Sequence, residues 1–298
     1  MSKLRIVFIG CVEFSSKALK KLIDLENFPV GIITKKESIF NSDFNDLSEI
    51  AIEHNIPFKH VNNVNHILNI EWIKSKKPDV ILCFGWSSII GNEILSIPCL
   101  GVIGYHPALL PYNRGRHPLI WALVLGLTKT ASSFFFMDSG ADTGDILSQR
   151  EVKISNEDDA RSLYNKITET GLIQIEEFIT ELALGNFDRI KQQIGVGNSW
   201  RKRIKKDGKI DFRMTADGIK NLVRALTRPY VGAHLELETG NFIVWKVEID
   251  RTIDQENIEP GKILEVQGSR IKVKCAKDSV WLVEHELQEI PLIGDYLI

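Results

Sequence analysis

Short apolar runs alternate with amphipathic stretches through the first two thirds of the chain. Four continuous runs of the kind found in buried parallel strands come first, and they are Leu4–Ile9, Val30–Thr34, Asp79–Phe84 and Gly101–Tyr105. After the first run, apolar residues recur at helical spacing from Phe14 to Ile23. This alternation of strands and helices predicts an α/β domain built on a doubly wound, mainly parallel sheet of the Rossmann type.

The same pattern continues beyond residue 116. The stretch His117–Leu127 is apolar almost all round and predicts a buried helix. Thr130–Met137 and Ile146–Ile154 predict two more strands. A long helix is expected to begin at Ser155, because Asp158 three residues later forms a variant of the capping box.

The composition and the hydrophobic pattern of the sequence change beyond Gly195. The stretch Ser199–Lys209 is polar and basic, and Thr215–Thr227 predicts a short amphipathic helix. Closely spaced short strands then indicate a small, barrel-like domain of the OB type. These strands are Ala233–Glu238, Phe242–Glu248, Lys262–Val266, Ile271–Ala276 and Ser279–Glu284. We therefore expect one domain over residues 1–204 and a smaller β-rich domain over residues 205–298.

Composition and charge narrow the class of protein. The 298 residues are 44% hydrophobic and 26% charged, as in soluble globular proteins. The net charge of −2 argues against a protein that clamps nucleic acid through many phosphates. The cysteines are Cys11, Cys83, Cys99 and Cys275. They show no CxxC spacing and are expected to be buried thiols in a reducing compartment. No stretch fits a signal peptide or a membrane span, so we expect a cytoplasmic protein with no membrane partner.

The segment from Gly101 to Arg116 carries the strongest candidate chemistry. Its strand exits at His106, and Pro107 prevents a helix from following at once, so the imidazole is expected at the carboxyl edge of the sheet. Two other loops are expected at this edge, residues 84–88 and 138–145. A histidine and a carboxylate that meet there suit proton transfer. The alternative is a structural histidine beside a solvated acidic loop.

Other site types fit the sequence less well. Loop 138–145 has oxygens at alternate positions, as in calcium or magnesium sites, but its length and the missing distal Glu argue against an EF-hand. We expect no metal. The segment Gly10–Ser16 follows the first strand without the GxGxxG spacing of a dinucleotide site, and the chain has no GxSxG or P-loop motif.

Three motifs together resemble the formyltransferases that use N10-formyltetrahydrofolate. They are FIGCVEFSSKAL at the first strand and helix, GVIGYHPALLPYNRGRHPLIWAL from residue 101, and DSGADTGDILSQ from residue 138. A later signature over residues 208–246, GKIDF…IKNLVRAL…VWK, is similar to the second domain of methionyl-tRNA and aminosugar formyltransferases. The resemblance covers nearly the whole chain. It implies the formyltransferase fold, with the catalytic domain over residues 1–204 and N10-formyltetrahydrofolate as the formyl donor.

The resemblance implies catalytic roles for two residues. His106 would stabilise or protonate the tetrahedral intermediate, and Asp142 would orient His106 and help to take the proton from the attacking amine. The family's third catalytic residue is an Asn two positions before the His, where this chain has Gly104, which offers no side-chain donor to an oxyanion. We expect Asn113, or a backbone N–H freed by Gly104, to take that role. A slow or inactive protein is the alternative.

The resemblance also implies that the folate lies against loops 84–90 and 138–142. The expected contacts are Phe84, Gly85, Trp86, Ser88, Ile90, Asp138 and Gly140. Trp86 would be an aromatic wall or, alternatively, a partly buried packing residue. Arg114 and Arg116 would either fix their loop by pairing with the acidic segment or contact the acceptor.

Two amines are candidate acceptors. Methionyl-tRNA enzymes of this family carry a basic insertion, whereas the stretch Ile33–Asp46 has only Lys35, Lys36 and several acids. This difference, the net charge and the RGRHPLIWAL segment favour a nucleotide-linked aminosugar, whose diphosphate needs only a few cationic groups. The expected substrate contacts are Tyr105, Arg116, Trp200, Arg201, Arg203 and Arg228. For the basic cluster from residue 201 to 206, an exposed linker is the alternative.

Two other interpretations stay open at the level of sequence. The chain is also consistent with a methionyl-tRNA formyltransferase, or with a non-catalytic folate or nucleotide-sugar binding protein that has lost the Asn. Apolar surface on the C-terminal domain is compatible with a homodimer.

Overall fold

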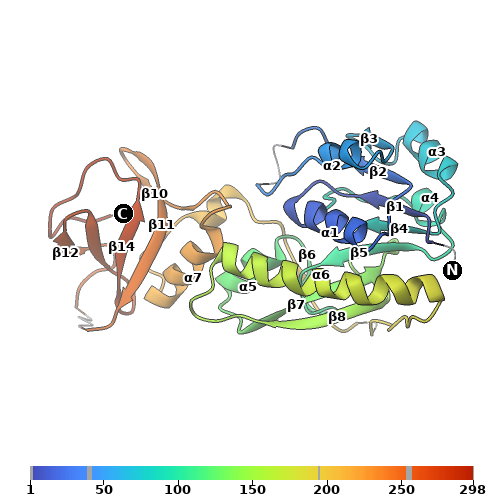
Figure 1. Cartoon of the computed structure of the whole chain (residues 1–298). Helices are drawn as coiled ribbons and strands as arrows, with labels where there is room; N and C mark the ends of the chain where they lie inside the picture. Colours follow the sequence, from blue (N-terminus) through green and yellow to red (C-terminus); the bar gives the residue numbers. More distant parts are fainter. Residues whose placement is uncertain (1–2, 39–41, 194, 253–256, 298) are drawn as a thin grey trace. The chain divides into compact units, whose positions relative to one another are not determined.

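The computed structural model describes residues 3–38, 42–193, 195–252 and 257–297. The chain divides into two compact units (Figure 1). The first unit comprises Met1–Pro118, Thr130–Val152 and Asn165–Trp200, and the second comprises Leu119–Lys129, Lys153–Tyr164 and Arg201–Ile298. Two segments of the expected N-terminal domain thus cluster with the second unit. The functional division after residue 204 stays a prediction.

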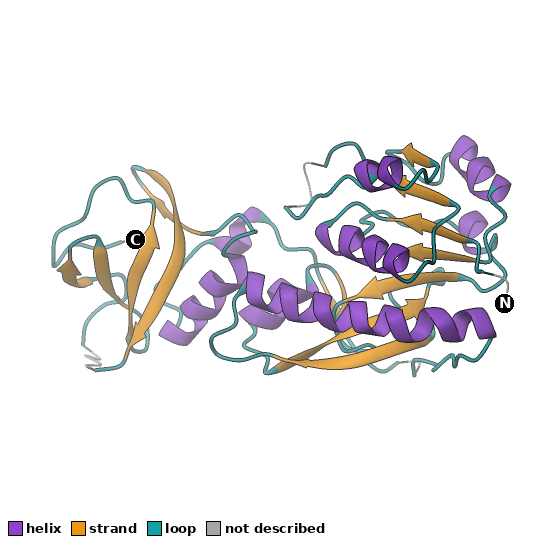
Figure 2. Ribbon diagram, viewed as in Figure 1, coloured by secondary structure: helices purple, strands orange, loops and turns teal. Residues whose placement is uncertain are grey.

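The first unit is built on a seven-stranded sheet in the order β3-β2-β1-β4-β5-β7-β8. Its strands are labelled in Figure 1 and drawn in orange in Figure 2. Its strands are β1 (Ile6–Ile9), β2 (Gly31–Thr34), β3 (Phe58–His60), β4 (Val80–Cys83), β5 (Val102–His106), β7 (Lys129–Phe136) and β8 (Ile146–Lys153). The pairs β3-β2, β2-β1, β1-β4 and β4-β5 are parallel, whereas β7 is antiparallel to β5. The predicted α/β fold with a mainly parallel sheet is confirmed.

Burial explains why these sequences form these elements. Every residue of β1, β2 and β4 is buried, as the continuous apolar runs predicted. The helices are α1 (Glu13–Asp24), α2 (Ser48–Glu53), α3 (Ile67–Ser75), α4 (Asn92–Leu95), α5 (Pro118–Val124) and α6 (Ala160–Leu184). Helix α6 begins later than the capping pattern predicted. The Asp158 carboxylate does accept the Ser155 N–H, at 2.7 Å, but this bond closes a turn that precedes the helix.

Strand β7 runs antiparallel to β5, and this direction determines where loop 138–145 leaves the sheet. Because β7 is antiparallel to β5, Phe136 lies opposite Ile103, and loop 138–145 leaves the sheet beside the start of β5. Its expected origin at the carboxyl edge of β5 is therefore wrong. A Cβ on Gly144 would lie 1.7 Å from the carbonyl oxygen of Phe136, so this loop folds back tightly on its own strand.

The second unit contains a five-stranded antiparallel sheet in the order β10-β11-β14-β13-β12. Its strands are β10 (Ala233–Leu237), β11 (Gly240–Asp250), β12 (Ile263–Gln267), β13 (Arg270–Lys274) and β14 (Ser279–His285). Helix α7 (Ala216–Leu226) buries an apolar face in this unit, and the Thr215 hydroxyl caps it by accepting the Gly218 N–H at 3.1 Å. The expected β-rich C-terminal fold is confirmed as an antiparallel sheet with one packed helix.

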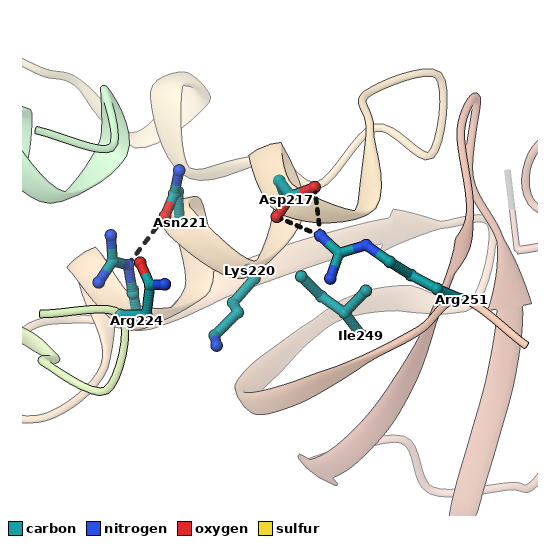
Figure 3. A pocket seen from close by; sticks show the side chains of 7 residues that line it. Asp217, Lys220, Asn221, Arg224, Ile249 and Arg251 are labelled. Carbon is teal, nitrogen blue, oxygen red and sulfur yellow. Dashed lines mark hydrogen bonds and ion pairs between the residues drawn. The ribbon is translucent and has the colours of Figure 1, made fainter.

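A small polar cavity of about 130 Å³ lies beside α7 (Figure 3). It is lined by Asn156, Asp217, Lys220, Asn221, Arg224, Ile249 and Arg251. The Arg251 guanidinium donates to both carboxylate oxygens of Asp217 at 2.8 Å. Arg224 donates to Asn221 at 2.9 Å and to two backbone carbonyl oxygens at 3.0 Å. Both arginines therefore tie α7 to neighbouring segments of the second unit.

Two smaller expectations can be compared with the structure. Within the described part of the chain, no helix is long and apolar enough to cross a membrane. Cys11, Cys83 and Cys275 are buried, and burial raises the pKa of the Cys83 and Cys275 thiols to about 12. Cys99 is exposed, so the expectation that all four thiols are buried is wrong for this residue, which lies in the turn between α4 and β5.

Candidate active site

His106 is the last residue of β5, and only 5% of its surface is exposed. Its Nε2 atom lies 2.8 Å from the carbonyl oxygen of Asn113. A carbonyl oxygen can only accept a hydrogen bond, so Nε2 carries a proton and donates it. Nδ1 is then the ring nitrogen that is left for a reacting group.

Asp142 faces this second ring nitrogen. Its Oδ2 atom lies 3.6 Å from His106 Nδ1, slightly beyond hydrogen-bonding distance. The same oxygen accepts the Gly115 N–H at 2.9 Å. The carboxylate is therefore held beside the imidazole by the backbone of the loop that follows His106. The fold brings together the two residues that the sequence motifs paired.

The loops that carry this pair have unusual backbone geometry. Asn113, Gly115 and Asp142 adopt left-handed conformations, with φ of 64°, 98° and 58°. A Cβ on Gly115 would lie 2.4 Å from the Trp200 carbonyl oxygen, so this position requires glycine. The close approach arises because β6 (Arg114–Gly115) pairs in parallel with β9 (Ser199–Trp200). Residues 199–200 thus help to fix the loop that holds the carboxylate.

Gly104 lies on the same face of β5 as His106, because the two are two residues apart in a strand. A Cβ at this position would lie 2.9 Å from both Met137 Cγ and Phe135 Cζ. Phe135 belongs to a buried apolar cluster with Leu110 and Ile146, and Met137 packs against that cluster. Apolar side chains therefore fill the space that the amide of an Asn would need.

The two groups expected to replace that amide, the Gly104 N–H and Asn113, lie in different environments. Gly104 pairs with Cys83 of β4 on one side and with Phe135 of β7 on the other, so its backbone lies inside the sheet. The expectation of an N–H freed by Gly104 is wrong. Asn113 lies beside the imidazole through its carbonyl oxygen, and its N–H donates to Asn198 Oδ1 at 2.8 Å. Its partly exposed side chain makes no hydrogen bond to other described residues.

Loop 84–90 presents its expected folate contacts in different ways. Phe84 is fully buried and Ile90 is 4% exposed, so both residues belong to the core. The Phe84 N–H donates to the Ile9 carbonyl oxygen, and its carbonyl oxygen accepts the Ser15 hydroxyl. Gly85 has φ of 70°, and a Cβ there would lie 2.1 Å from the Val12 side chain. Ser88 is exposed. The turn at Gly85 therefore positions the loop, and the backbone supplies most of its polar groups.

Trp86 is a partly buried packing residue, and its role as an aromatic wall for the folate stays a prediction. The indole packs against the buried cluster around Ile9 and Cys83, and the Lys35 ammonium lies 4.9 Å from its ring centre. Its Nε1 atom is buried and has no hydrogen-bond partner within the described ranges. A buried N–H without a partner is costly, so Nε1 is a hydrogen-bond donor that the described residues leave unsatisfied.

Asp138 and Gly140 shape the second expected folate loop. The Asp138 carboxylate accepts the Gly140 N–H at 2.9 Å and the Thr143 hydroxyl at 2.6 Å. A Cβ on Gly140 would lie 2.0 Å from the Thr143 hydroxyl oxygen. The carboxylate is thus committed to the turn of its own loop.

Of the expected substrate contacts in the first unit, Tyr105 is packed inside the domain, whereas Arg116 and Trp200 lie at the loop after His106. Tyr105 is adjacent to His106 in β5 and so faces the other side of the sheet, where its ring stacks on Phe14 at 4.0 Å between ring centres. Tyr105 therefore points away from the face of the sheet that carries His106, and its expected contact with the substrate is wrong. Arg116 is exposed and donates to the Ser87 carbonyl oxygen at 3.2 Å, and its N–H donates to the Trp200 carbonyl oxygen at 3.0 Å. Arg116 and Trp200 thus adjoin loop 84–90 and the loop after His106.

The other expected cations, Arg201, Arg203 and Arg228, belong to the second unit. Arg201 forms two hydrogen bonds with the Asp207 carboxylate, at 2.7 and 2.6 Å, and this pairing lowers the pKa of Asp207. The Arg203 guanidinium lies 4.6 Å from the ring centre of Trp121. Arg228 donates to Glu284 at 2.7 Å and lies 4.2 Å from the ring centre of Trp245. Each of these arginines has local partners in its own unit.

Sequence reasoning missed Gln192. Its side chain bonds to the backbone of Asp142 and to the guanidinium of Arg114. Because a lone Gln in an irregular polar segment belongs to no motif, only the folded chain reveals this contact. Within the described ranges, no group of three or more His, Cys, Asp or Glu side chains is arranged to hold a metal ion.

The fold and the site together define a class of protein. A buried histidine at the end of a parallel strand, with a carboxylate against its free ring nitrogen, is an arrangement used for acid–base catalysis. Residues 4–178 match the Formyl transferase family, and residues 203–291 match the family described as Formyl transferase, C-terminal domain. The chain belongs to the formyl transferase family and is a formyltransferase enzyme.

Individual relatives cover most of the chain. It is 31% identical to the methionyl-tRNA formyltransferase of Geobacter sulfurreducens over 292 aligned residues. The alignment covers 97% of this chain and 90% of that protein. It is 30% identical to the bifunctional polymyxin resistance protein ArnA of Wigglesworthia glossinidia brevipalpis, over 98% of this chain and 44% of that protein. The N-formyltransferase from Helicobacter canadensis, solved with folinic acid and dTDP-3-aminofucose, superposes with a TM-score of 0.66 at 15% identity, over 94% of this chain and 98% of that one.

Packing around Gly104 generates a testable prediction. Gly104→Ala should lower the free energy of unfolding by about 1–3 kcal/mol, because the new Cβ must displace Phe135 or Met137. In a Phe135→Leu background, which lacks the Cζ atom, the same substitution should cost less. Urea unfolding of the wild type, both single variants and the double variant measures the difference. An equal cost in both backgrounds would contradict this account of the glycine.

Proposed function

We propose that this protein transfers a formyl group from N10-formyltetrahydrofolate to a primary amine at a centre formed by His106 and Asp142. The observation that carries the proposal is the geometry of this pair. Nε2 is committed to the Asn113 carbonyl oxygen at 2.8 Å, and Nδ1 lies 3.6 Å from the Asp142 carboxylate. An imidazole and a carboxylate that can exchange a proton are therefore held next to each other.

The two residues divide the proton transfers. When the amine adds to the formyl carbon, its nitrogen loses a proton, and the Asp142 carboxylate accepts it directly or through one water. That proton passes from Asp142 to the free Nδ1 of His106, 3.6 Å away, through one water or a small approach of the two groups. The bond from the formyl carbon to N10 then breaks, and His106 gives this Nδ1 proton to the departing nitrogen. The ring and the carboxylate thereby return to their starting states.

Loop 84–90 supports the proposal of a folate donor. Its Trp86 Nε1 is a buried donor that has no partner in the described part of the chain, and a pteridine carries acceptors that fit such a group. The exposed Ser88 and the backbone around Gly85 add further polar groups at the same loop. We expect the bound donor to supply the activated formyl carbon, while this loop binds and orients it.

Asn113 is our proposed substitute for the missing family amide. Its backbone is fixed on both sides, because its carbonyl oxygen accepts from His106 and its N–H donates to Asn198. Its side-chain amide makes no hydrogen bond to other described residues, so its donors remain free for an oxygen that gains charge as the amine adds. The left-handed conformation, with φ of 64°, is one that Asn tolerates well.

Methionyl-tRNA is the acceptor that the comparisons favour. The relative from Geobacter sulfurreducens matches over nearly the full length of both chains, and its name specifies this acceptor. The sequence expectation of an aminosugar has weaker support from relatives of comparable identity. We therefore propose methionyl-tRNA as the first acceptor.

A nucleotide-linked aminosugar is the second candidate, and the charge of the chain favours it. The net charge is −2, which is unusual for a protein that must hold a polyanion. The exposed Arg116 beside Trp200 suits one diphosphate.

The proposed centre predicts the effects of two isosteric substitutions. His106→Asn and Asp142→Asn should each lower kcat by about 10²- to 10⁴-fold, because each removes a group that carries a proton. The rate is measured as release of tetrahydrofolate in the presence of the amine acceptor. The matched control is His117→Asn, at a second histidine of the same segment. Either substitution leaving the rate intact would refute the proposed centre.

The proposed amide donor predicts a second effect. Asn113→Gly should lower kcat by about 10²- to 10³-fold, because it removes one donor while keeping the left-handed backbone accessible. Asn113→Ala would add backbone strain and is therefore the weaker test. Thermal melting should show that Asn113→Gly folds normally. Unchanged turnover would rule out Asn113 as the donor.

An assay of the candidate acceptors side by side identifies the substrate. We expect radiolabelled formyl to be transferred to methionyl-tRNA and not to a panel of dTDP-, UDP- and GDP-linked aminosugars. Because a tRNA is bound through phosphates, its kcat/KM should fall steeply as salt is raised. Formylation of an aminosugar alone would overturn the first acceptor in favour of the second. Folate binding without turnover on any acceptor would support the non-catalytic alternative.

A further inference from the structure

Gln192 makes four hydrogen bonds around the backbone of Asp142. Its Nε2 atom donates to the carbonyl oxygen of Asp142 at 2.9 Å and to that of Gly144 at 2.8 Å. Its Oε1 atom accepts from Arg114 Nε at 3.2 Å and from Arg114 Nη2 at 2.6 Å. Arg114 Nε also donates to the Asp142 carbonyl oxygen, at 3.2 Å. The side chain of Gln192 therefore connects the loop after His106 to the loop that carries the carboxylate.

We propose that Gln192 is a positioning residue that holds Asp142 in register with His106. The inference rests on the proposed function, because it assigns Gln192 a role only through the Asp142 carboxylate. Asp142 has φ of 58°, a conformation that costs energy for a residue with a Cβ and persists only when its surroundings enforce it. The two donors on its carbonyl oxygen provide that enforcement.

The carboxylate and the carbonyl of Asp142 are fixed by neighbouring residues of one loop. Gly115 donates its N–H to Asp142 Oδ2 at 2.9 Å, and Arg114 binds the Asp142 carbonyl oxygen. Arg114 is itself oriented by Gln192 Oε1. Gln192 thus acts on the carboxylate along two routes, directly through the main chain of Asp142 and indirectly through Arg114.

The segment that contains Gln192 is anchored at both ends. Ile190 exchanges two backbone hydrogen bonds with Ile146, at 2.8 and 2.9 Å. Asn198 accepts the Asn113 N–H, and Ser199–Trp200 pairs with Arg114–Gly115. Among the described residues from 190 to 200, contacts therefore reach both catalytic loops. Gln192 lies between the anchors, so its position is set by backbone pairing on either side.

The predicted consequence is a loss of turnover rather than of acceptor binding. Gln192→Ala removes one donor to the Asp142 carbonyl oxygen and the acceptor that orients Arg114, so Asp142 can relax away from its left-handed conformation and from His106. Small misplacements of a reacting group are costly, and we expect kcat to fall by about 10- to 100-fold with little change in KM for the amine. The matched control is Gln193→Ala, at the exposed neighbour, which should leave kcat unchanged.

A second variant distinguishes the amide donor of Gln192 from the oxygen that accepts from Arg114. Gln192→Glu keeps an oxygen for Arg114 but replaces the amide donor, so it should be at least as slow as Gln192→Ala. Thermal melting of each variant reports folding independently of rate.

The decisive measurement is a double-mutant cycle in which kcat is determined for Gln192→Ala in the wild-type and Asp142→Asn backgrounds. If Gln192 acts through the carboxylate, its removal should cost little once Asp142 is already Asn. A full additional loss in that background, or a Gln192→Ala variant as fast as Gln193→Ala, would overturn the inference. If Asp142→Asn alone leaves kcat unchanged, it is the proposed function that fails, and the two failures are thereby distinguished.

Discussion

The hydrogen bond from His106 Nε2 to the Asn113 carbonyl oxygen is the interaction on which the site depends. It fixes the ring orientation and places the proton on Nε2, so Nδ1 alone faces the Asp142 carboxylate. The acceptor carbonyl belongs to a residue in a left-handed turn, and the N–H of the same residue is held by Asn198. The chemistry proposed for the imidazole thus depends on a few backbone conformations after β5.

The substitution at Gly104 alters the wall of this site as well as its donors. Phe135, across the ladder from Gly104, and Met137 occupy the volume that a side chain on β5 would take. The wall beside His106 is therefore apolar and tightly packed, so an Asn cannot be accommodated there without movement of its neighbours. Because Phe135 and Met137 pack over Gly104, a side-chain donor in place of the family amide must come from outside β5.

Much of the fold could be read from hydrophobic pattern, because buried parallel strands such as β1 and β4 are continuous apolar runs. The elements that pattern missed are short or partly exposed. Strand β3 is only partly buried, and β6 and β9 have two residues each. Their pairing depends on contacts between segments far apart in the chain. The direction of β7 was likewise unreadable, since an apolar run predicts burial but not orientation.

The sequence by itself determined the α/β class, the β-rich second part, and the His106 and Asp142 motifs that identify the family. These are local properties, because periodicity, turn residues and motif spacing are written in consecutive positions. Only the tertiary structure decided which ring nitrogen faces Asp142, that Gly104 is enclosed by Phe135 and Met137, and that Gln192 supports Asp142 from fifty residues away. Each of these depends on side chains and carbonyl groups brought together by backbone pairing between distant segments, for which a single sequence carries no local signal.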